Sequence, residues 1–299
     1  MKNKIQRSKS LFYSVLAVLL IIWVSSVFIV FLWTLATTFR LKIDFELFGP
    51  LDFTSGPLSF KNWGLVFTDF YAEAIVSGYG SKKFYIEDML INTILYSIGS
   101  TVAFILALTL MSYIVGRFPN KISTFLQGMC IVTMSLPIVG ALPSEIAMAK
   151  SLGIYGTMWG LWIMAFTYNG FYFLILSQSF KAIPKDFADS ASIDGAGRLR
   201  IMLSIMLPMV KNVIGTIALI RFVEVWNNYQ TPLIYLPESP TLMYGFMMLT
   251  LSPPKGVPDF YALPARFAVC IVVALPIIVL FTAFNKKFLG NLSMGGLKE

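Results

Sequence analysis

Residues 183–208 read IPKDFADSASIDGAGRLRIMLSIMLP, and they form the longest polar interval in the second half of an otherwise apolar chain. Pro184 suits the first turn of a helix, where its missing N–H is not needed, and Asp186 adds negative charge near the positive helix end. Ile183, Phe187 and Ala191 follow at i, i+4 and i+8, which predicts one apolar stripe. The stretch is therefore expected to begin with a short amphipathic helix.

Small and polar residues predict how this helix ends. Asp189 lies off the apolar stripe and can face a partner. Gly195 can end the helix in a left-handed turn, and Asp194 is placed to accept N–H bonds from a second helix that begins near Ala196. This pattern favours a helix that docks into a groove of a soluble subunit, but it also fits an interfacial helix with no partner.

Composition identifies a membrane protein. The chain has 299 residues, of which 57% are hydrophobic and 13% are charged, whereas about 25% charged residues is usual for soluble domains. Several apolar runs reach the roughly 20 residues that a bilayer-spanning helix needs. Backbone groups in lipid must be paired internally, and the runs do not alternate as barrel strands do. We therefore expect an all-α polytopic membrane protein that contacts lipid.

Six apolar segments predict six transmembrane helices, with the N- and C-termini in the cytoplasm. Their approximate ranges are 11–35, 89–115, 122–142, 156–178, 205–235 and 266–284. The first run is too long for a secretory signal, whose apolar core has roughly 7–15 residues. The loops assigned to the cytoplasm hold twice as many Lys and Arg residues as those assigned outside, which fits the positive-inside rule.

The predicted organisation has four parts. They are the N-terminus with the first transmembrane helix (1–36), an extracytoplasmic loop (37–88), a transmembrane core (89–285) that contains a cytoplasmic loop at 181–208, and a cytoplasmic tail (286–299).

Sequence features of enzymes and metalloproteins are missing. The chain has no His, no phosphate-binding Gly-x-x-x-x-Gly-Lys-Ser/Thr motif and no finger-like ligand spacing. Cys130 and Cys270 lie in apolar runs and are expected to be small buried hydrophobic residues. We expect no catalytic site, no metal and no cofactor. The net charge of +8 is explained by membrane topology and not by nucleic-acid binding.

The stretch 183–208 resembles the EAA loop of permeases from ABC importers. Asp189-Ser190-Ala191 takes the place of Glu-Ala-Ala, and Asp194-Gly195-Ala196 and Leu207-Pro208 fall in register. Asp189 is one methylene shorter than Glu, and Asn212 stands where the family often has a second proline.

Weaker patterns resemble the carbohydrate-type, maltose-class permeases. They are Phe60–Gly64, Asn92, Ser112–Arg117, Leu152–Thr157, Trp226-Asn227 with Pro232-Leu233, and the terminal Gly-Gly-Leu-Lys.

The resemblance implies a type I ABC importer permease in a bacterial-type plasma membrane, and hence a transport subunit and not an enzyme. Its partners would be cytoplasmic ABC ATPase subunits, a second permease subunit that is a related but different chain, and an extracytoplasmic solute-binding protein. The residues implied in ATPase coupling are Asp189, Ser190, Ala191, Asp194, Gly195, Ala196, Gly197 and Pro208.

The fifth predicted span is the most polar. Ionisable groups within a span are costly, usually face the bundle interior and often mark a pathway. Arg221 and Glu224 are i, i+3 neighbours that can pair. Candidate translocation-path residues are Tyr168, Asn169, Tyr172, Arg221, Glu224, Trp226 and Asn227. The alternative is a structural ion pair with packing aromatic residues.

Three functions stay open on the sequence. The first is an ABC permease for a sugar or oligosaccharide. The second is an ABC permease for a peptide, amino acid or polyol. The third is an ion-coupled secondary carrier, which would usually show internal repeats.

Overall fold

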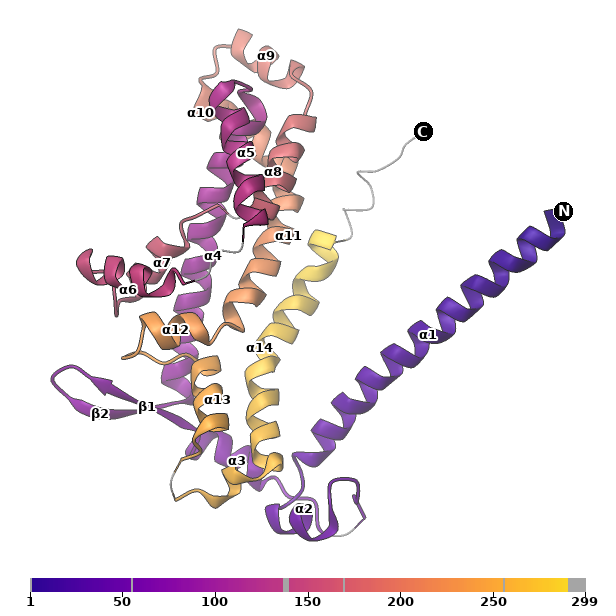
Figure 1. Cartoon of the computed structure of the whole chain (residues 1–299), viewed down its shortest axis with the longest axis vertical. Helices are drawn as coiled ribbons and strands as arrows, with labels where there is room; N and C mark the ends of the chain where they lie inside the picture. The colour runs from indigo at the N-terminus through magenta and orange to yellow at the C-terminus, as the bar shows by residue number, and fades with distance from the viewer. Residues whose placement is uncertain (1, 55, 137–139, 169, 255, 290–299) are drawn as a thin grey trace. The chain divides into compact units, whose positions relative to one another are not determined.

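The computed structural model describes residues 2–54, 56–136, 140–168, 170–254 and 256–289, and it is mainly helical (Figure 1). The elements in chain order are α1 (Lys2–Thr37), α2 (Lys42–Phe48), α3 (Lys61–Thr68), β1 (Tyr71–Val76), β2 (Gly80–Tyr85), α4 (Ile86–Arg117), α5 (Lys121–Ser135), α6 (Leu142–Ser151), α7 (Met158–Ala165), α8 (Gly170–Ala182), α9 (Asp186–Ile193), α10 (Arg198–Ile201), a π-helical turn (Met202–Met206), α11 (Leu207–Trp226), α12 (Gln230–Tyr235), α13 (Leu242–Leu251), a 3-10 turn (Pro258–Tyr261) and α14 (Leu263–Leu289).

The chain forms two compact units. The first contains Met1–Phe70 and Met248–Val273, and the second contains Tyr71–Met247 and Ala274–Glu299.

In the first unit, Asn62 holds the end of α1. Its buried amide donates to the carbonyl of Thr38 at 2.9 Å and to that of Arg40 at 2.7 Å. Lys61 forms an ion pair with Asp259 at 3.1 Å, which joins distant parts of the chain within this unit. The segment Phe60–Gly64 therefore has a structural role as the start of α3.

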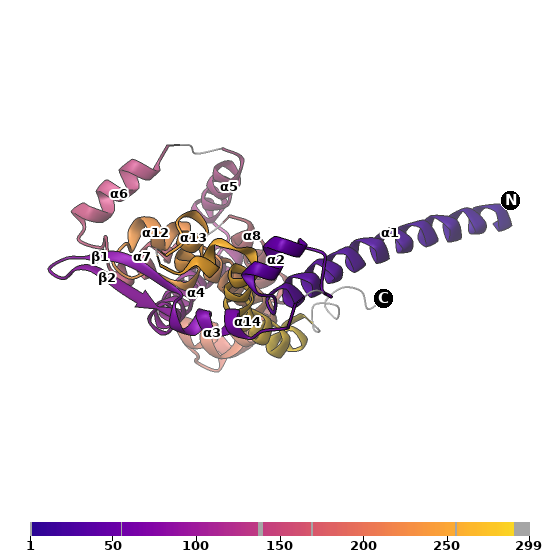
Figure 2. The ribbon, with the colours of Figure 1, turned by 90° about the horizontal axis from the view of Figure 1, so that it is seen from below.

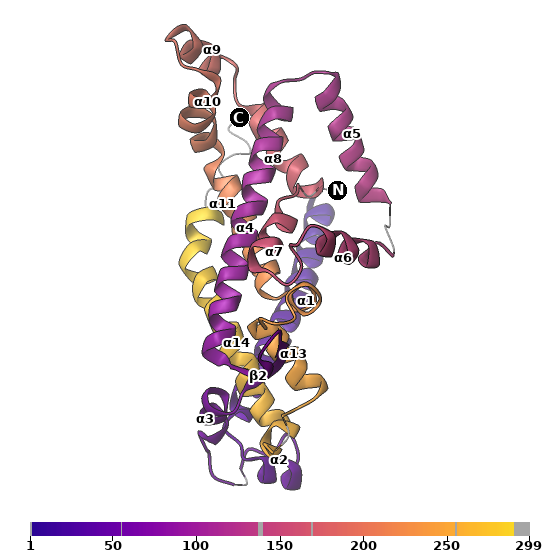
Figure 3. The ribbon, with the colours of Figure 1, turned by 90° about the vertical axis from the view of Figure 1, so that its left-hand side faces the viewer.

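The second unit is built around α4. Figures 1 and 3 show α8 and α11 beside it. One buried core joins Phe104 and Leu108 of α4 to Phe173 and Leu176 of α8 and to Ile217 of α11. Large side chains of the three helices interlock in this core, and their van der Waals contacts fix how the helices pack.

An antiparallel hairpin precedes α4 and projects from its N-terminal end (Figures 1 and 2). Tyr71 pairs with Tyr85, and Gly78 and Gly80 take positive φ at the turn. Ser77 donates a hydrogen bond of 2.8 Å to Glu238. The prediction of an all-α chain overlooked this hairpin, whose strands have only six residues each.

Four helices in the described part of the chain are long and apolar enough to cross a bilayer. They are Phe12–Thr37, Ile86–Arg117, Arg198–Trp226 and Leu263–Phe284, and the bent pair α7–α8 would make a fifth. The helix α5, predicted within the third span, has 15 residues and ends before residues 137–139, which are not described. The six-span count and the placement of the termini stay predictions.

Two predicted spans have different boundaries in the structure. The fourth is two helices, α7 and α8, whose axes differ by 58°. The chain leaves the helix at Ala165, where the N–H of Thr167 donates to the Ala165 carbonyl at 2.8 Å. The fifth begins at Arg198 and ends at Trp226. After this end, the Asn228 side chain accepts the N–H of Thr231 in the first turn of α12 at 2.9 Å.

The two cysteines differ in their environment. Cys130 on α5 is buried, as expected, but Cys270 on α14 is exposed, so the prediction for that residue was wrong. An apolar run that spans a bilayer places part of its surface against lipid, and its composition does not show which residues face inward. The terminal Gly-Gly-Leu-Lys motif lies outside the described residues.

Gly99 provides a test of the packing around α4. A Cβ atom there would overlap the indole of Trp162, whose Nε1 donates to the Leu95 carbonyl at 3.1 Å. We expect Gly99→Leu to destabilise the folded protein by about 1–3 kcal/mol through overpacking. The measurement is thermal unfolding of the purified chain in mild detergent.

The matched control is Gly128→Ala on α5, where a Cβ atom meets nothing within 4 Å. We expect this change to be neutral or to stabilise, because Ala is the better helix former. Equal unfolding temperatures for both variants and the wild type would contradict the packing described for α4.

Candidate coupling segment and translocation path

Residues 181–208, here called the coupling segment, lie at one end of the second unit, where α9 and α10 follow α8 (Figure 1). The predicted order of short helix, turn and second helix is confirmed. Gly195 has φ +79°, so a left-handed residue ends α9 as expected. The N–H of Ala196 donates to the Ala191 carbonyl at 2.9 Å and that of Gly195 to the Ser192 carbonyl at 3.1 Å, which is the Schellman pattern.

The coupling segment presents apolar side chains to solvent. Phe187 is 49% exposed, Ile193 is 86% exposed and Leu199 is 67% exposed. Its small residues face the other way, since Ala188, Ala191 and Ala196 pack against the core of the unit. Asp189, Ser190, Asp194, Gly195 and Gly197 are exposed. Exposed large apolar side chains beside carboxylates form a surface suited to a protein partner.

Three local expectations for this segment were wrong. Helix α9 begins at Asp186 with Lys185 as its N-cap, so Pro184 precedes the helix. Ile183 is buried outside α9 while Phe187 is exposed, so the two do not share an apolar stripe. The side chain of Asp194 does not cap α10, because the N-cap of that helix is Gly197 and Asp194 is the C-cap of α9.

Pro208 lies in the first turn of α11, directly after the π-helical turn Met202–Met206. Proline has no N–H for an i→i−4 bond, so the regular ladder is interrupted at this point. Single π turns inside helices often occur at functional positions. The coupling segment therefore continues into α11 through an irregular turn.

Three candidate path residues meet in the second unit. The Tyr172 hydroxyl on α8 donates to Oε1 of Glu224 on α11 at 2.7 Å. Nη1 of Arg221 donates to Oε2 of the same carboxylate at 3.1 Å, which confirms the predicted pair. The Arg221 guanidinium also lies 4.9 Å from the ring centroid of Phe104 on α4. This cluster links α4, α8 and α11 by polar contacts.

The other candidate residues are placed differently. Trp226 is buried and its ring lies 5.7 Å from that of Phe222. Tyr168 is half-buried with its ring 5.4 Å from that of Phe173. Both positions fit the packing alternative. Asn169 lies outside the described residues. Asn227 donates from its side chain to the Val223 carbonyl at 2.9 Å.

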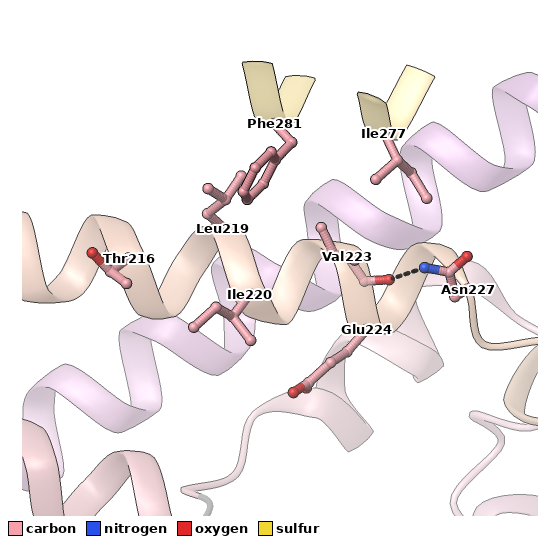
Figure 4. Close-up of a pocket in the computed structure, with 8 residues that line it drawn as sticks. All are labelled: Thr216, Leu219, Ile220, Val223, Glu224, Asn227, Ile277 and Phe281. Carbon is pink, nitrogen blue, oxygen red and sulfur yellow. Dashed lines mark hydrogen bonds between the residues drawn. The ribbon is translucent and has the colours of Figure 1, made fainter. Parts of the chain in front are cut away.

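A cavity of about 430 Å³ lies between α11 and α14 (Figure 4). Its lining is Thr216, Leu219, Ile220, Val223, Glu224, Asn227, Ile277 and Phe281. In Figure 4, Phe281 points toward Leu219, while Glu224 extends to the side of α11 away from the α14 residues. The volume is within the range of ligand pockets, about 300–1,000 Å³.

Sequence reasoning missed seven residues of this region. Phe104 contacts the guanidinium, and the others line the cavity: Thr216, Leu219, Ile220, Val223, Ile277 and Phe281. The six apolar residues look like any lipid-facing residue of a span. Thr216 carried a weak signal, since its hydroxyl lies one or two helical turns before Arg221 and Glu224.

Because Tyr172 and Glu224 share a hydrogen bond, substitutions at the two residues should have non-additive effects on the stability of the protein. We expect Tyr172→Phe to destabilise the protein by about 0.6 kcal/mol, the mean for such contacts between membrane helices, and Glu224→Met by at least as much, because Met cannot accept the hydrogen bond. The double variant should lose less than the sum, because both changes remove the same hydrogen bond. Thermal unfolding in detergent of the four proteins measures this, and strictly additive losses would contradict the contact.

Comparisons with known proteins agree with this arrangement. The family described as "Binding-protein-dependent transport system inner membrane component" matches residues 108–289, more than half of the chain. The chain is 28% identical over 261 residues to a polygalacturonan/rhamnogalacturonan transport system permease protein of Bacillus subtilis, covering 80% of this chain and 85% of the relative. It is 28% identical over 214 residues to a maltodextrin transport system permease protein of the same organism, covering 69% of this chain and 74% of the relative.

The fold is similar to a chain in the crystal structure of a bacterial ABC transporter involved in the import of the acidic polysaccharide alginate. The TM-score is 0.75 at 20% identity, over 94% of this chain and 98% of that one. This likeness establishes the fold of an ABC importer permease. The chain therefore belongs to the family of binding-protein-dependent transport system inner membrane components, and it is a multi-pass transport subunit of a bacterial plasma membrane and not an enzyme.

Proposed function

We propose that this chain is the permease subunit of an ABC importer for an oligosaccharide, and that it forms half of the translocation path. The observation that carries the proposal is the coupling segment: an exposed helix-turn-helix on a chain whose family works with binding proteins. A secondary carrier has no use for such an element. The proposed partners are two ATPase subunits, a second permease chain and an extracytoplasmic solute-binding protein.

The coupling segment is suited to contact the ATPase. Phe187 and Ile193 can bury their exposed surface in a groove of that subunit, while Asp189 offers a carboxylate for an ion pair. Burial of apolar surface provides roughly 25 cal/mol per Å², and the carboxylate provides orientation. Closure of the ATPase dimer on ATP would move α9, and α10 would pass that movement to α11 through the π-helical turn.

An oligosaccharide fits the chemistry of the path. Sugars present hydroxyl edges, which carboxylate, guanidinium and phenol groups bind, and C–H faces, which aromatic rings cover. The cluster of Tyr172, Arg221 and Glu224 supplies the first set, and the ring of Tyr172 supplies the second. The names of the two Bacillus relatives, both permeases for saccharide polymers or oligomers, support the same substrate class.

The coupling role predicts opposite outcomes for two substitutions at Gly195. Gly195 has φ +79° and open space where a Cβ atom would lie, so the cost of a side chain there is backbone strain and not a clash. We expect Gly195→Val to abolish transport, since a left-handed β-branched residue costs roughly 1–2 kcal/mol or more. Gly195→Asn should retain transport, because Asn adopts this conformation more readily.

Two substitutions at Asp189, one that reverses its charge and one that keeps it, are also expected to have opposite outcomes. Asp189→Lys should abolish ATP-driven uptake, while Asp189→Glu should support it. The measurement is uptake of labelled solute by proteoliposomes that contain the complete transporter, with membrane insertion of each variant checked by blotting. Normal uptake by Asp189→Lys and Gly195→Val would contradict the coupling assignment.

Uptake of labelled solutes tests the substrate class. Cells that express the complete system should take up pectin-derived or malto-oligosaccharides and not peptides or amino acids. Glu224→Gln should lower uptake of the oligosaccharide without lowering the amount of protein in the membrane. Uptake confined to a peptide, an amino acid or a polyol would replace the saccharide with that solute.

A further inference from the structure

Gly116, Arg117 and Phe118, at the C-terminal end of α4, lie beside the end of α8 and contact the coupling segment before α9 and at the start of α10. We call these three residues the α4 terminus. They follow the buried part of α4, and Arg117 is the final residue of the helix. Each of them makes a different kind of contact, and together these contacts connect α4 to the region that moves with the ATPase under the proposed function.

Gly116 allows α4 and α8 to approach closely. A Cβ atom there would lie 2.6 Å from the backbone oxygen of Ser177 and 2.9 Å from Cβ of Phe180. Both distances are shorter than van der Waals contact, and one of the atoms belongs to the backbone, so only glycine fits. The backbones of α4 and α8 therefore lie close together at this point.

Arg117 holds the start of the coupling segment. Its Nη1 donates to the Ile183 carbonyl at 2.8 Å, across 66 positions of sequence. Ile183 lies between the end of α8 at Ala182 and the start of α9 at Asp186, and its side chain is buried. A carbonyl just beyond a helix C-terminus lies at the negative end of that helix, which favours a cationic donor.

Phe118 contacts the coupling segment at the start of α10. The guanidinium of Arg198, the first residue of α10, lies 5.8 Å from its ring centroid, within the range of a cation–π interaction. A crevice of about 260 Å³ separates α4 from α10 and the π-helical turn at this point. The start of the segment is thus held by a close hydrogen bond, while α10 borders an open crevice.

We propose that Arg117 is a positioning residue that fixes α9 to α4, so that the movement of the ATPase reaches α4 as well as α11. This inference rests on the proposed function. In the complete transporter, α9 and α4 then move as one body, and the rotation occurs at α10 and the π-helical turn. Loss of the Arg117 hydrogen bond would let α9 move without α4, and ATP would be hydrolysed without transport.

The first test measures solute transported per ATP hydrolysed in proteoliposomes with the complete transporter. Arg117→Met should lower this ratio about tenfold while ATP hydrolysis continues, a loss within the usual range of coupling free energies. Arg117→Lys keeps the charge and one donor and should give an intermediate ratio. The control is Lys121→Met, an exposed cation nearby at the start of α5 that should leave the ratio unchanged.

The second test does not depend on the folding of an Arg117 variant. Spin labels replace two exposed residues, Ser192 on α9 and Leu106 on α4, in a chain with Cys130 and Cys270 changed to Ala. The distance between the labels should be the same in the nucleotide-free and ATP-trapped transporter. A distance that changes with nucleotide, or a normal transport ratio for Arg117→Met, would overturn the inference. Failure of the unlabelled wild-type transporter to hydrolyse ATP would instead refute the proposed function.

Discussion

The close approach of α4 to the helices around it is the constraint on which the second unit depends. Gly99 leaves room for the Trp162 indole, and Gly116 leaves room for the backbone of α8. Membrane helices gain little from the hydrophobic effect against each other, so small residues that permit close packing provide much of their association energy. The buried core between α4, α8 and α11, and with it the position of the coupling segment, follows from this packing.

The same three helices contribute the charged cluster. An ionisable residue inside a membrane span is stabilised when it is paired. The Glu224 carboxylate accepts from Arg221 and from Tyr172, and the guanidinium lies over Phe104, so each charge has a partner within the cluster. The three side chains hold one another in place, so the cluster depends on how α8 packs against α11.

The features that could be predicted well from the sequence are those set by one residue's own chemistry. Gly195 required a left-handed turn, and the turn is there; Arg221 and Glu224 were three residues apart on a helix, and they pair.

The errors came from choices between competing local contacts. Asp194 was expected to cap α10, but the backbone of Gly195 and Ala196 closes α9 instead. The break between α7 and α8 was missed although Thr167, Tyr168 and Asn169 interrupt the apolar run, because polar residues within a span were expected to mark the translocation path. Contacts between distant residues could not be predicted, since nothing near Arg117 in the sequence points to the carbonyl of Ile183. The resemblance to ABC permeases supplied the family and the coupling motif, but not the geometry that joins the coupling segment to the remainder of the unit.

The importer assignment is tested most directly by purifying the tagged chain from its native membrane in mild detergent and identifying the associated proteins by mass spectrometry. We expect recovery of an ABC ATPase, a second permease chain and a solute-binding protein. A chain that is recovered alone, stable and able to move a solute with an ion gradient and no ATP would contradict the assignment.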